Sequence, residues 1–207
     1  KIIEEKDCTE AERKIQEINS GLYLFRTRYL MDKLQHLTNQ NQAKEFYLTD
    51  LFKPGASVAA LHFKDAWSFQ GVNTLEQLEC ATQLALEEKV FYLREQGVRF
   101  FDSTAVWIDW DVRVGKGTTL YPQVHLLGKT TVDENVTIEP GCFVRDSVIH
   151  MGAHLKAYSY LDQASVGAAA HVGPFTHLRP LAQIGPECRV GNFVEIKKSK
   201  LAEGAKV

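Results

Sequence analysis

The second half of the chain carries a six-residue repeat that limits the folds open to it. From Ile108 to Val207 an aliphatic residue recurs every six positions, with a step of five at Val144–Ile149, Leu161–Val166 and Ile196–Leu201. Two residues before almost every one of them stands a smaller side chain, usually Thr, Ser, Ala, Cys or Val. Residues i and i−2 of a strand face the same side, so each hexapeptide indicates one short strand with one inward face.

Hexapeptide repeats are typical of a parallel β-helix, in which three strands make one coil of about eighteen residues. The repeat region is long enough for roughly five coils, each of which needs a stacked neighbour to bury its apolar face. We expect the smaller residues to fill the corners and the aliphatic residues to fill the axis. The alternative is a β-sandwich, which would show alternating strands and turn signals every 8–12 residues or so.

Composition places the chain among ordinary soluble globular proteins of one or two domains. It has 207 residues, of which 44% are hydrophobic and 24% charged, and its net charge is −2. This charge gives no reason to expect nucleic acid or anionic membranes as partners. The cysteines lack the spacing of a zinc site, which favours reduced thiols and a cytoplasmic location; they are Cys8, Cys80, Cys142 and Cys188. No signal-like segment opens the chain, and we expect it to begin within a longer protein.

Three segments follow from these patterns: residues 1–73, a linker helix at 74–97 and the β-helix at 98–207. Thr74 and Gln77 predict a capping box at the start of the linker helix, and Gly97 predicts its end. We expect an apolar stripe of this helix to be packed, formed by Leu75, Leu78, Ala81, Leu84 and Ala85.

Residues 1–73 show an α/β pattern that is thin for a whole domain. Thr9 and Glu12 predict a capped short helix, and a leucine spacing of i, i+4 and i+7 from Leu30 predicts a second helix. Apolar runs predict strands at 22–25 and 58–63. With no glycine-rich phosphate loop, the segment is interpreted as the end of a larger α/β domain.

Seven short motifs occur in an order that identifies a family resemblance. They are Ile-Glu-Glu-Lys-Asp (3–7), Glu-Ile-Asn-Ser-Gly (17–21), Phe-Tyr-Leu-Thr-Asp (46–50), Gly-Val-Asn (71–73), Val-Gly-Pro-Phe (172–175), Leu-Arg-Pro (178–180) and Gly-Asn-Phe-Val-Glu-Ile-Lys-Lys (191–198). Across essentially its whole length, the chain resembles the bacterial bifunctional N-acetylglucosamine-1-phosphate uridyltransferase / glucosamine-1-phosphate acetyltransferase.

The resemblance implies a fold, an assembly and two reactions. The fold would be the C-terminal part of a nucleotide-sugar pyrophosphorylase domain, a long helix and a left-handed β-helix, assembled as a homotrimer. Acetyl-CoA would acetylate glucosamine 1-phosphate between neighbouring β-helices, and UTP would then give UDP-N-acetylglucosamine for peptidoglycan and lipopolysaccharide. The family's nucleotide loop is expected upstream of Lys1 and its catalytic Gly-His histidine beyond Val207. We therefore expect a central fragment that performs neither reaction efficiently.

In the uridyltransferase site, the resemblance implies that Glu4, Asn19 and Asn73 contact the UDP-sugar. Asn73 also matches a magnesium ligand, and an asparagine carbonyl suits this hard cation, which would offset charge on the phosphate oxygens. Without the resemblance, Asn19 before Ser-Gly is a typical turn residue and Asn73 a typical residue of a helix entry.

Arg179 and Lys197 follow repeat positions three hexapeptides apart, so counting places them one coil apart on one outward face. Two cations that close favour an anion between them, such as a sugar phosphate. The same column carries Asp162 and Arg145, so a structural charge ladder with a solvated Lys197 is the alternative. The resemblance implies that Arg179 and Lys197 bind the sugar phosphate of the acetyl acceptor.

Five histidines lie in the array outside the Gly-His motif, and each is interpreted as a loop or surface residue; they are His125, His150, His154, His171 and His177. Two other functions stay open. One is a related pyrophosphorylase whose β-helix only regulates or oligomerises, and the other is a non-enzymatic trimerising scaffold.

Overall fold

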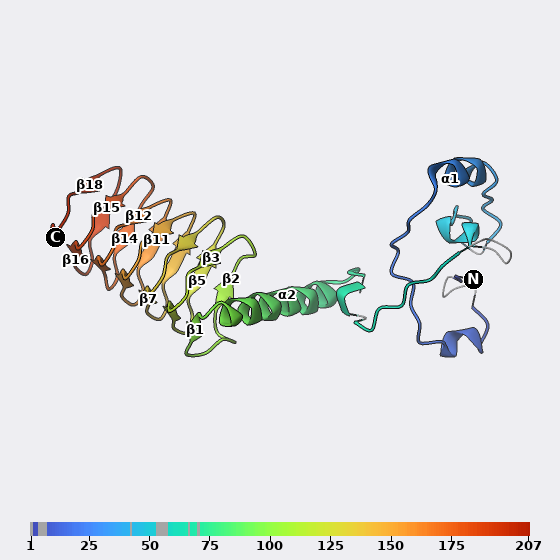
Figure 1. The fold of residues 1–207 in the computed structure, drawn as a ribbon, viewed down its shortest axis with the longest axis horizontal. Coiled ribbons are helices and arrows are strands. Elements are labelled where there is room, and N and C mark those ends of the chain that lie inside the picture. Colours follow the sequence, from blue (N-terminus) through green and yellow to red (C-terminus); the bar gives the residue numbers. More distant parts are fainter. Residues whose placement is uncertain (1, 4–7, 42, 53–57, 66, 70) are drawn as a thin grey trace. The chain divides into compact units, whose positions relative to one another are not determined.

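A computed structural model describes residues 2–3, 8–41, 43–52, 58–65, 67–69 and 71–207. The chain divides into two compact units, Lys1–Asn73 and Thr74–Val207. The first is a small region of helical turns and loops, and the second contains a long helix and a parallel β-helix (Figure 1).

In its described residues, the first unit contains one α-helix and three 3-10 turns, namely α1 (Thr27–Leu34), η2 (Glu12–Lys14), η3 (Leu48–Leu51) and η4 (Trp67–Phe69). The capping pair predicted before η2 is present, because Glu12 N–H donates to Thr9 Oγ1 at 3.3 Å and Thr9 N–H donates to Glu12 Oε2 at 2.9 Å. The helix predicted around Leu30 is also present as α1.

The strands predicted at 22–25 and 58–63 do not form, since the described part of residues 1–73 contains no strand. Leu24 is fully exposed, and Leu51 is the only described residue of this unit that is buried. A strand needs a partner to satisfy its backbone groups, and no strand pairs with these apolar runs among the described residues of this unit. Tyr23, Phe25 and Phe52 form a small ring cluster instead.

The long helix of the second unit, α2 (Leu75–Glu95), has both predicted ends. Thr74 Oγ1 accepts from Gln77 N–H at 3.2 Å, and Gln77 Oε1 accepts from Thr74 N–H at 3.1 Å. At the other end Gly97 has φ +85°, with Gly97 N–H bonded to Arg94 O and Val98 N–H to Leu93 O. This pair of bonds is the Schellman motif.

The predicted apolar stripe of α2 is wrong. Leu75, Leu78 and Leu84 are exposed, by 85%, 51% and 40%. The buried residues are Lys89, Val90 and Leu93 near the C-terminal end, where α2 meets the first coil of the β-helix. Periodicity located an apolar face, but the packing partner reaches only the last turns of the helix.

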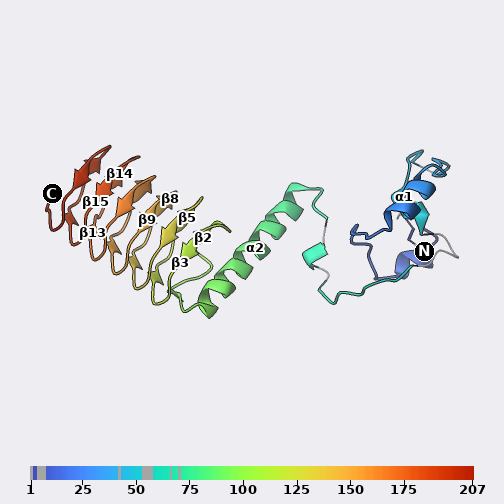
Figure 2. The same ribbon diagram turned by 45° about the horizontal axis from the view of Figure 1, so that its top comes forward.

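Eighteen short strands form three parallel sheets of six strands each, stacked as successive coils (Figure 2). The first sheet contains β1 (Arg99–Phe100), β4 (Thr119–Leu120), β7 (Thr137–Ile138), β10 (His154–Leu155), β13 (His171–Val172) and β16 (Arg189–Val190). The second contains β2 (Trp107–Ile108), β5 (His125–Leu127), β8 (Phe143–Arg145), β11 (Tyr160–Asp162), β14 (His177–Leu178) and β17 (Glu195–Ile196). The third contains β3 (Arg113–Val114), β6 (Thr131–Val132), β9 (Val148–Ile149), β12 (Ser165–Val166), β15 (Gln183–Ile184) and β18 (Lys200–Leu201).

The repeat positions form the core, as predicted. Aliphatic residues from Ile108 to Ile196 are buried, and the smaller residues two positions earlier are buried from Thr118 to Cys188. Buried hydroxyls bond to backbone carbonyls, as Thr118 Oγ1 does to Asp133 O at 2.8 Å and Thr176 Oγ1 to Gly191 O at 2.7 Å. The last repeat positions are less buried: Val194, Leu201 and Ala205 are partly buried, and Ser199 and Val207 are exposed.

The array begins one strand earlier than the six-residue pattern indicates. β1 pairs with β4, so Phe100 lies level with Leu120 and Val98 is buried in the core. A longer connection between Phe100 and Ile108 interrupts the six-residue step, which hides β1 from a periodicity count.

All four cysteines are free. Cys142 and Cys188 are buried at inward positions, where a thiol packs as a small apolar group. Burial raises the pKa of the Cys142 thiol to about 11.

Candidate functional site

Arg179 and Lys197 lie one coil apart on the outer face of the second sheet. β14 and β17 pair with Leu178 opposite Ile196, and Arg179 N–H donates to Ile196 O at 2.8 Å. Each cation directly follows one of these paired residues, so the two emerge side by side, at about the 4.8 Å spacing of neighbouring strands. The column obtained by counting repeats is therefore present in the structure.

Glu195 joins this pair of cations. Its Oε1 accepts from Arg179 Nη1 at 2.7 Å, and Glu195 lies opposite His177 in the pairing of β14 with β17. The hydrogen bond from Arg179, and then the charges of Arg179, His177 and Lys197, hold the pKa of the Glu195 carboxyl below its usual range. Glu195 was not predicted as a site residue, although its place in register with His177 follows from the same counting of repeats.

The charge ladder proposed as an alternative forms only in part. Arg145 and Asp162 are paired, with 3.2 Å between Arg145 Nε and Asp162 Oδ1. Arg179 takes Glu195 as its partner rather than Asp162, and within the described ranges no ion pair to Lys197 is found. Lys197 is exposed and can offer its ammonium to a bound anion.

A second column on the same face consists of rings. Phe143 and Tyr160 stack with centroids 4.7 Å apart and planes 2° apart, and His177 meets the Tyr160 ring edge-on at 5.0 Å. Arg179, Glu195 and Lys197 thus border a rigid aromatic surface. This arrangement can bind a compact anion through the cations, while the neighbouring rings restrict how the rest of the ligand lies.

Two of the three residues predicted for a uridyltransferase site, Asn19 and Asn73, lie in the described part of the chain. Glu4 lies outside the described residues. Asn19 forms a turn, since its Oδ1 accepts from Gly21 N–H at 3.3 Å and its Nδ2 donates to Tyr23 Oη at 2.6 Å. Asn73 is an exposed residue just before the α2 cap.

A magnesium site is not complete in the described part of the chain. No group of three or more His, Cys, Asp or Glu side chains there is arranged to hold a metal ion. Asn73 supplies one amide oxygen, whereas a hard cation needs several oxygen ligands. The described residues therefore do not fit the predicted ion by themselves.

The array histidines are surface residues, as predicted, but four begin strands rather than occupying loops. His125, His154, His171 and His177 are the first residues of their strands and face outward, and His150 directly follows β9. His150 and His154 bind acidic side chains, with His150 Nδ1 3.0 Å from Asp133 Oδ2 and His154 Nε2 2.6 Å from Glu139 Oε1.

No described helix is both long and apolar enough to cross a lipid bilayer. The fold is a parallel β-helix of hexapeptide repeats, and solved structures with a similar fold include two from Caulobacter crescentus. Perosamine N-acetyltransferase from Caulobacter crescentus, solved as a point mutant with CoA and GDP-perosamine, matches with a TM-score of 0.50 and 18% identity. The match covers 60% of this chain and 61% of that one. PerB from the same organism also matches with a TM-score of 0.50, at 19% identity.

Sequence comparison then gives the relatives. All of the chain aligns with proteins named bifunctional protein GlmU, at 37% identity in Geotalea uraniireducens, 39% in Carboxydothermus hydrogenoformans and 40% in Exiguobacterium. The whole chain is similar to part of these proteins, which confirms the resemblance found in the motifs. It spans about half the length of these relatives, namely 46%, 47% and 46%. No protein-family model matches the chain.

Proposed function

We propose that the chain provides the acceptor-sugar side of an acetyltransferase that acts in sugar-nucleotide synthesis. The observation that carries this proposal is the pair Arg179 and Lys197, adjacent on one outer face and bordered by Glu195. The Arg179 guanidinium keeps donors beyond the one bonded to Glu195, and a guanidinium fork suits a phosphate. Lys197 adds a second positive charge.

In the proposed reaction the acceptor is glucosamine 1-phosphate and the donor is acetyl-CoA. The acceptor's amine attacks the thioester carbonyl, coenzyme A leaves as the thiol, and a base must take a proton from the amine. Similarity to these relatives and the CoA bound to the perosamine acetyltransferase support this donor. The described histidines are not assigned as the base, because none of them lies in the Gly-His motif that the resemblance leads us to expect.

Some proposals concern the whole protein, and others concern parts of this chain for which only the relatives provide support. They are uridylyl transfer from UTP with magnesium, contacts of Glu4, Asn19 and Asn73 with the UDP-sugar, a pyrophosphorylase fold for residues 1–73, left-handedness of the β-helix, and a homotrimer. They rest on the relatives, of which the chain spans about half.

Calorimetric titration of the 207-residue protein with glucosamine 1-phosphate tests the acceptor site. We expect binding that Arg179→Ala weakens about tenfold, because a charge-assisted hydrogen bond contributes roughly 1.5–3 kcal/mol. Lys200→Ala, which removes an exposed lysine from β18 on another face, is the control. Glucosamine without phosphate should bind far more weakly. Equal affinity of Arg179→Ala and the unsubstituted protein would exclude Arg179 from the site.

A further inference from the structure

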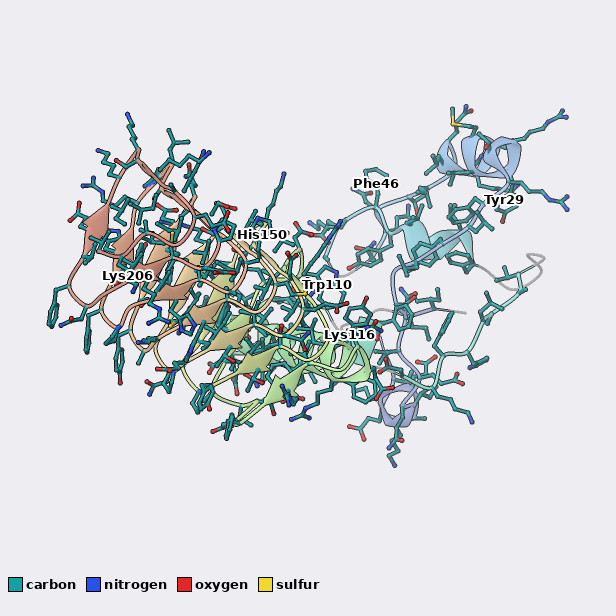
Figure 3. All side chains as sticks on the ribbon, turned by 60° about the vertical axis from the view of Figure 1, so that its left-hand side comes forward. Tyr29, Phe46, Trp110, Lys116, His150 and Lys206 are labelled. Carbon is teal, nitrogen blue, oxygen red and sulfur yellow. The ribbon has the colours of Figure 1, made fainter. Side chains whose placement is uncertain are left out.

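The outer face of the first sheet carries a column of cations at its C-terminal end. His171 pairs in register with His154 on one side and Arg189 on the other, and Arg189 forms a parallel bridge with Lys206. Lys156 lies beside this column, since its backbone N–H donates to Val172 O at 2.8 Å. We call Lys156, His171, Arg189 and Lys206 the basic strip; Figure 3 labels Lys206 on the terminal coil.

Carboxylates are nearly absent from this face. Glu139 lies at the early end of the strip, where it binds His154 and also accepts from Ala157 N–H at 3.0 Å. Beyond it, in the part of the chain that the structure describes, no carboxylate forms an ion pair with Lys156, Arg189 or Lys206. Glu187, at the corner before β16, is likewise without a described ion pair. Among the described residues, the strip therefore consists of cations that have no ion-pair partner, apart from the electrostatic contacts within the strip itself.

The cations influence one another electrostatically. Partial burial first, and then the charges of His154, Arg189 and Lys156, lower the pKa of His171. Like charges at the roughly 4.8 Å spacing of neighbouring strands repel each other, and a bound anion removes that repulsion. The next outward positions of β13 and β16 are Gly173 and Gly191, so no side chain stands beside His171 and Arg189 on that side.

We propose that the basic strip binds the phosphoryl group of a small anion, at a site separate from Arg179 and Lys197. The anionic oxygens of two linked phosphates would contact cations on two neighbouring coils, such as Arg189 and Lys206. Guanidinium and ammonium groups are the side chains that bind phosphate by charge-assisted hydrogen bonds. Free pyrophosphate and the diphosphate of a nucleotide are two sources of this chemistry. The proposal does not rest on the acetyl-acceptor site, which lies on another sheet.

Calorimetry with inorganic pyrophosphate tests the strip in protein that already carries Arg179→Ala and Lys197→Ala, so that the other cation pair cannot contribute. We expect pyrophosphate to bind this protein, and the further changes Arg189→Ala and Lys206→Ala to weaken binding at least about fivefold. Adding Arg113→Ala and Lys200→Ala instead removes the same charge from the outer face of the third sheet, at β3 and β18. This matched control should change the affinity less than about twofold.

Two further measurements separate a site from general attraction. ADP should bind as pyrophosphate does, whereas adenosine should not bind, and binding of adenosine would contradict a phosphoryl site. In NMR titrations the pKa of His171 should rise when pyrophosphate is bound, because the anion compensates the neighbouring cations. The proposal is overturned if the starting protein does not bind pyrophosphate, or if both charge-removing pairs weaken binding equally.

Discussion

Side chains on the β-helix surface form ion pairs with residues of the neighbouring coil, as Arg179 does with Glu195. Counting hexapeptides located Arg179 beside Lys197, because strand register fixes which residues share a column. It did not reveal that Arg179 is bonded to Glu195 rather than to Asp162. The strand register places both Asp162 and Glu195 near Arg179. The side-chain rotamers decide which of the two carboxylates pairs with Arg179, so the register alone does not predict the partner.

His171 makes stability depend on pH. Its folded pKa is below the ordinary value of 6.5, so the unfolded state binds a proton more readily. The stability associated with neutral His171 is complete above pH about 6.5 and is lost as the pH falls through that value toward the folded pKa. We expect His171→Gln to lose less free energy of unfolding than the unsubstituted protein between pH 7.5 and 5.5, measured by urea titration.

A second variant tests the cause of the shift. Arg189→Gln removes one of the charges that lower the pKa of His171, so this pKa should rise when followed by NMR. The explanation would be contradicted by an unchanged pKa of His171 in Arg189→Gln. It would also be contradicted if His171→Gln and the unsubstituted protein lost the same free energy of unfolding between pH 7.5 and 5.5.

Lys89 connects α2 to the first coil. Its Nζ donates to Trp110 O at 2.7 Å and to Val112 O at 2.8 Å, and it lies 5.8 Å from the Tyr92 ring centroid and 5.7 Å from that of Trp110. Lys89→Met keeps the apolar stem but leaves both carbonyls without this donor. We expect a loss of about 1–3 kcal/mol in the free energy of unfolding, measured with urea.

The matched control is Lys116→Met on the same part of the molecule. Lys116 Nζ lies 3.7 Å from Glu134 Oε1 in an exposed ion pair. Such pairs contribute about 0–1 kcal/mol, so this change should have little effect. If Lys89→Met and Lys116→Met lose the same free energy of unfolding, the bonds from Lys89 to the two carbonyls do not stabilise the contact between α2 and the first coil.

At the scale of elements, local signals predicted helix ends and strands of the array, because both depend on neighbours in the sequence. The Thr74 capping box, the Gly97 stop and the inward positions of the repeat are all present. The α2 stripe and the strands at 22–25 and 58–63 depend on distant partners. The spacing of apolar residues predicts which face of a helix or strand is apolar. It does not predict whether another part of the protein covers that face.

The end of α2 depends on the left-handed conformation of Gly97, with φ +85°. A Cβ there would lie 3.5 Å from Lys116 Cβ, an ordinary contact, so backbone strain is the main cost of a side chain. We expect Gly97→Ala to lower the free energy of unfolding by about 1–2 kcal/mol. Gly97→Asn should lose less, because asparagine tolerates this conformation better. Equal free energies of unfolding for Gly97→Ala and Gly97→Asn, measured with urea, would contradict the expected strain.

For the β-helix as a whole, stability is approximately a sum of coils and of the contacts between neighbouring coils. Position along the array should therefore decide the effect of one and the same substitution. Leu161 is fully buried in β11, between β8 and β14, whereas Leu201 is partly exposed in β18, which pairs only with β15. The two side chains are identical and occupy equivalent inward positions of the repeat.

Leu161→Ala should lower the free energy of unfolding by about 2–5 kcal/mol, since coils on both sides hold the cavity open. Leu201→Ala should cost roughly 1 kcal/mol, because less apolar area leaves contact and solvent already reaches the site. Urea unfolding gives both values, and amide hydrogen exchange shows where the loss appears. Leu201→Ala should increase exchange only in the last coil, whereas Leu161→Ala should increase it on both sides of β11. Exchange that increases equally throughout the array in both variants would mean that the array unfolds as a single cooperative unit rather than as linked coils.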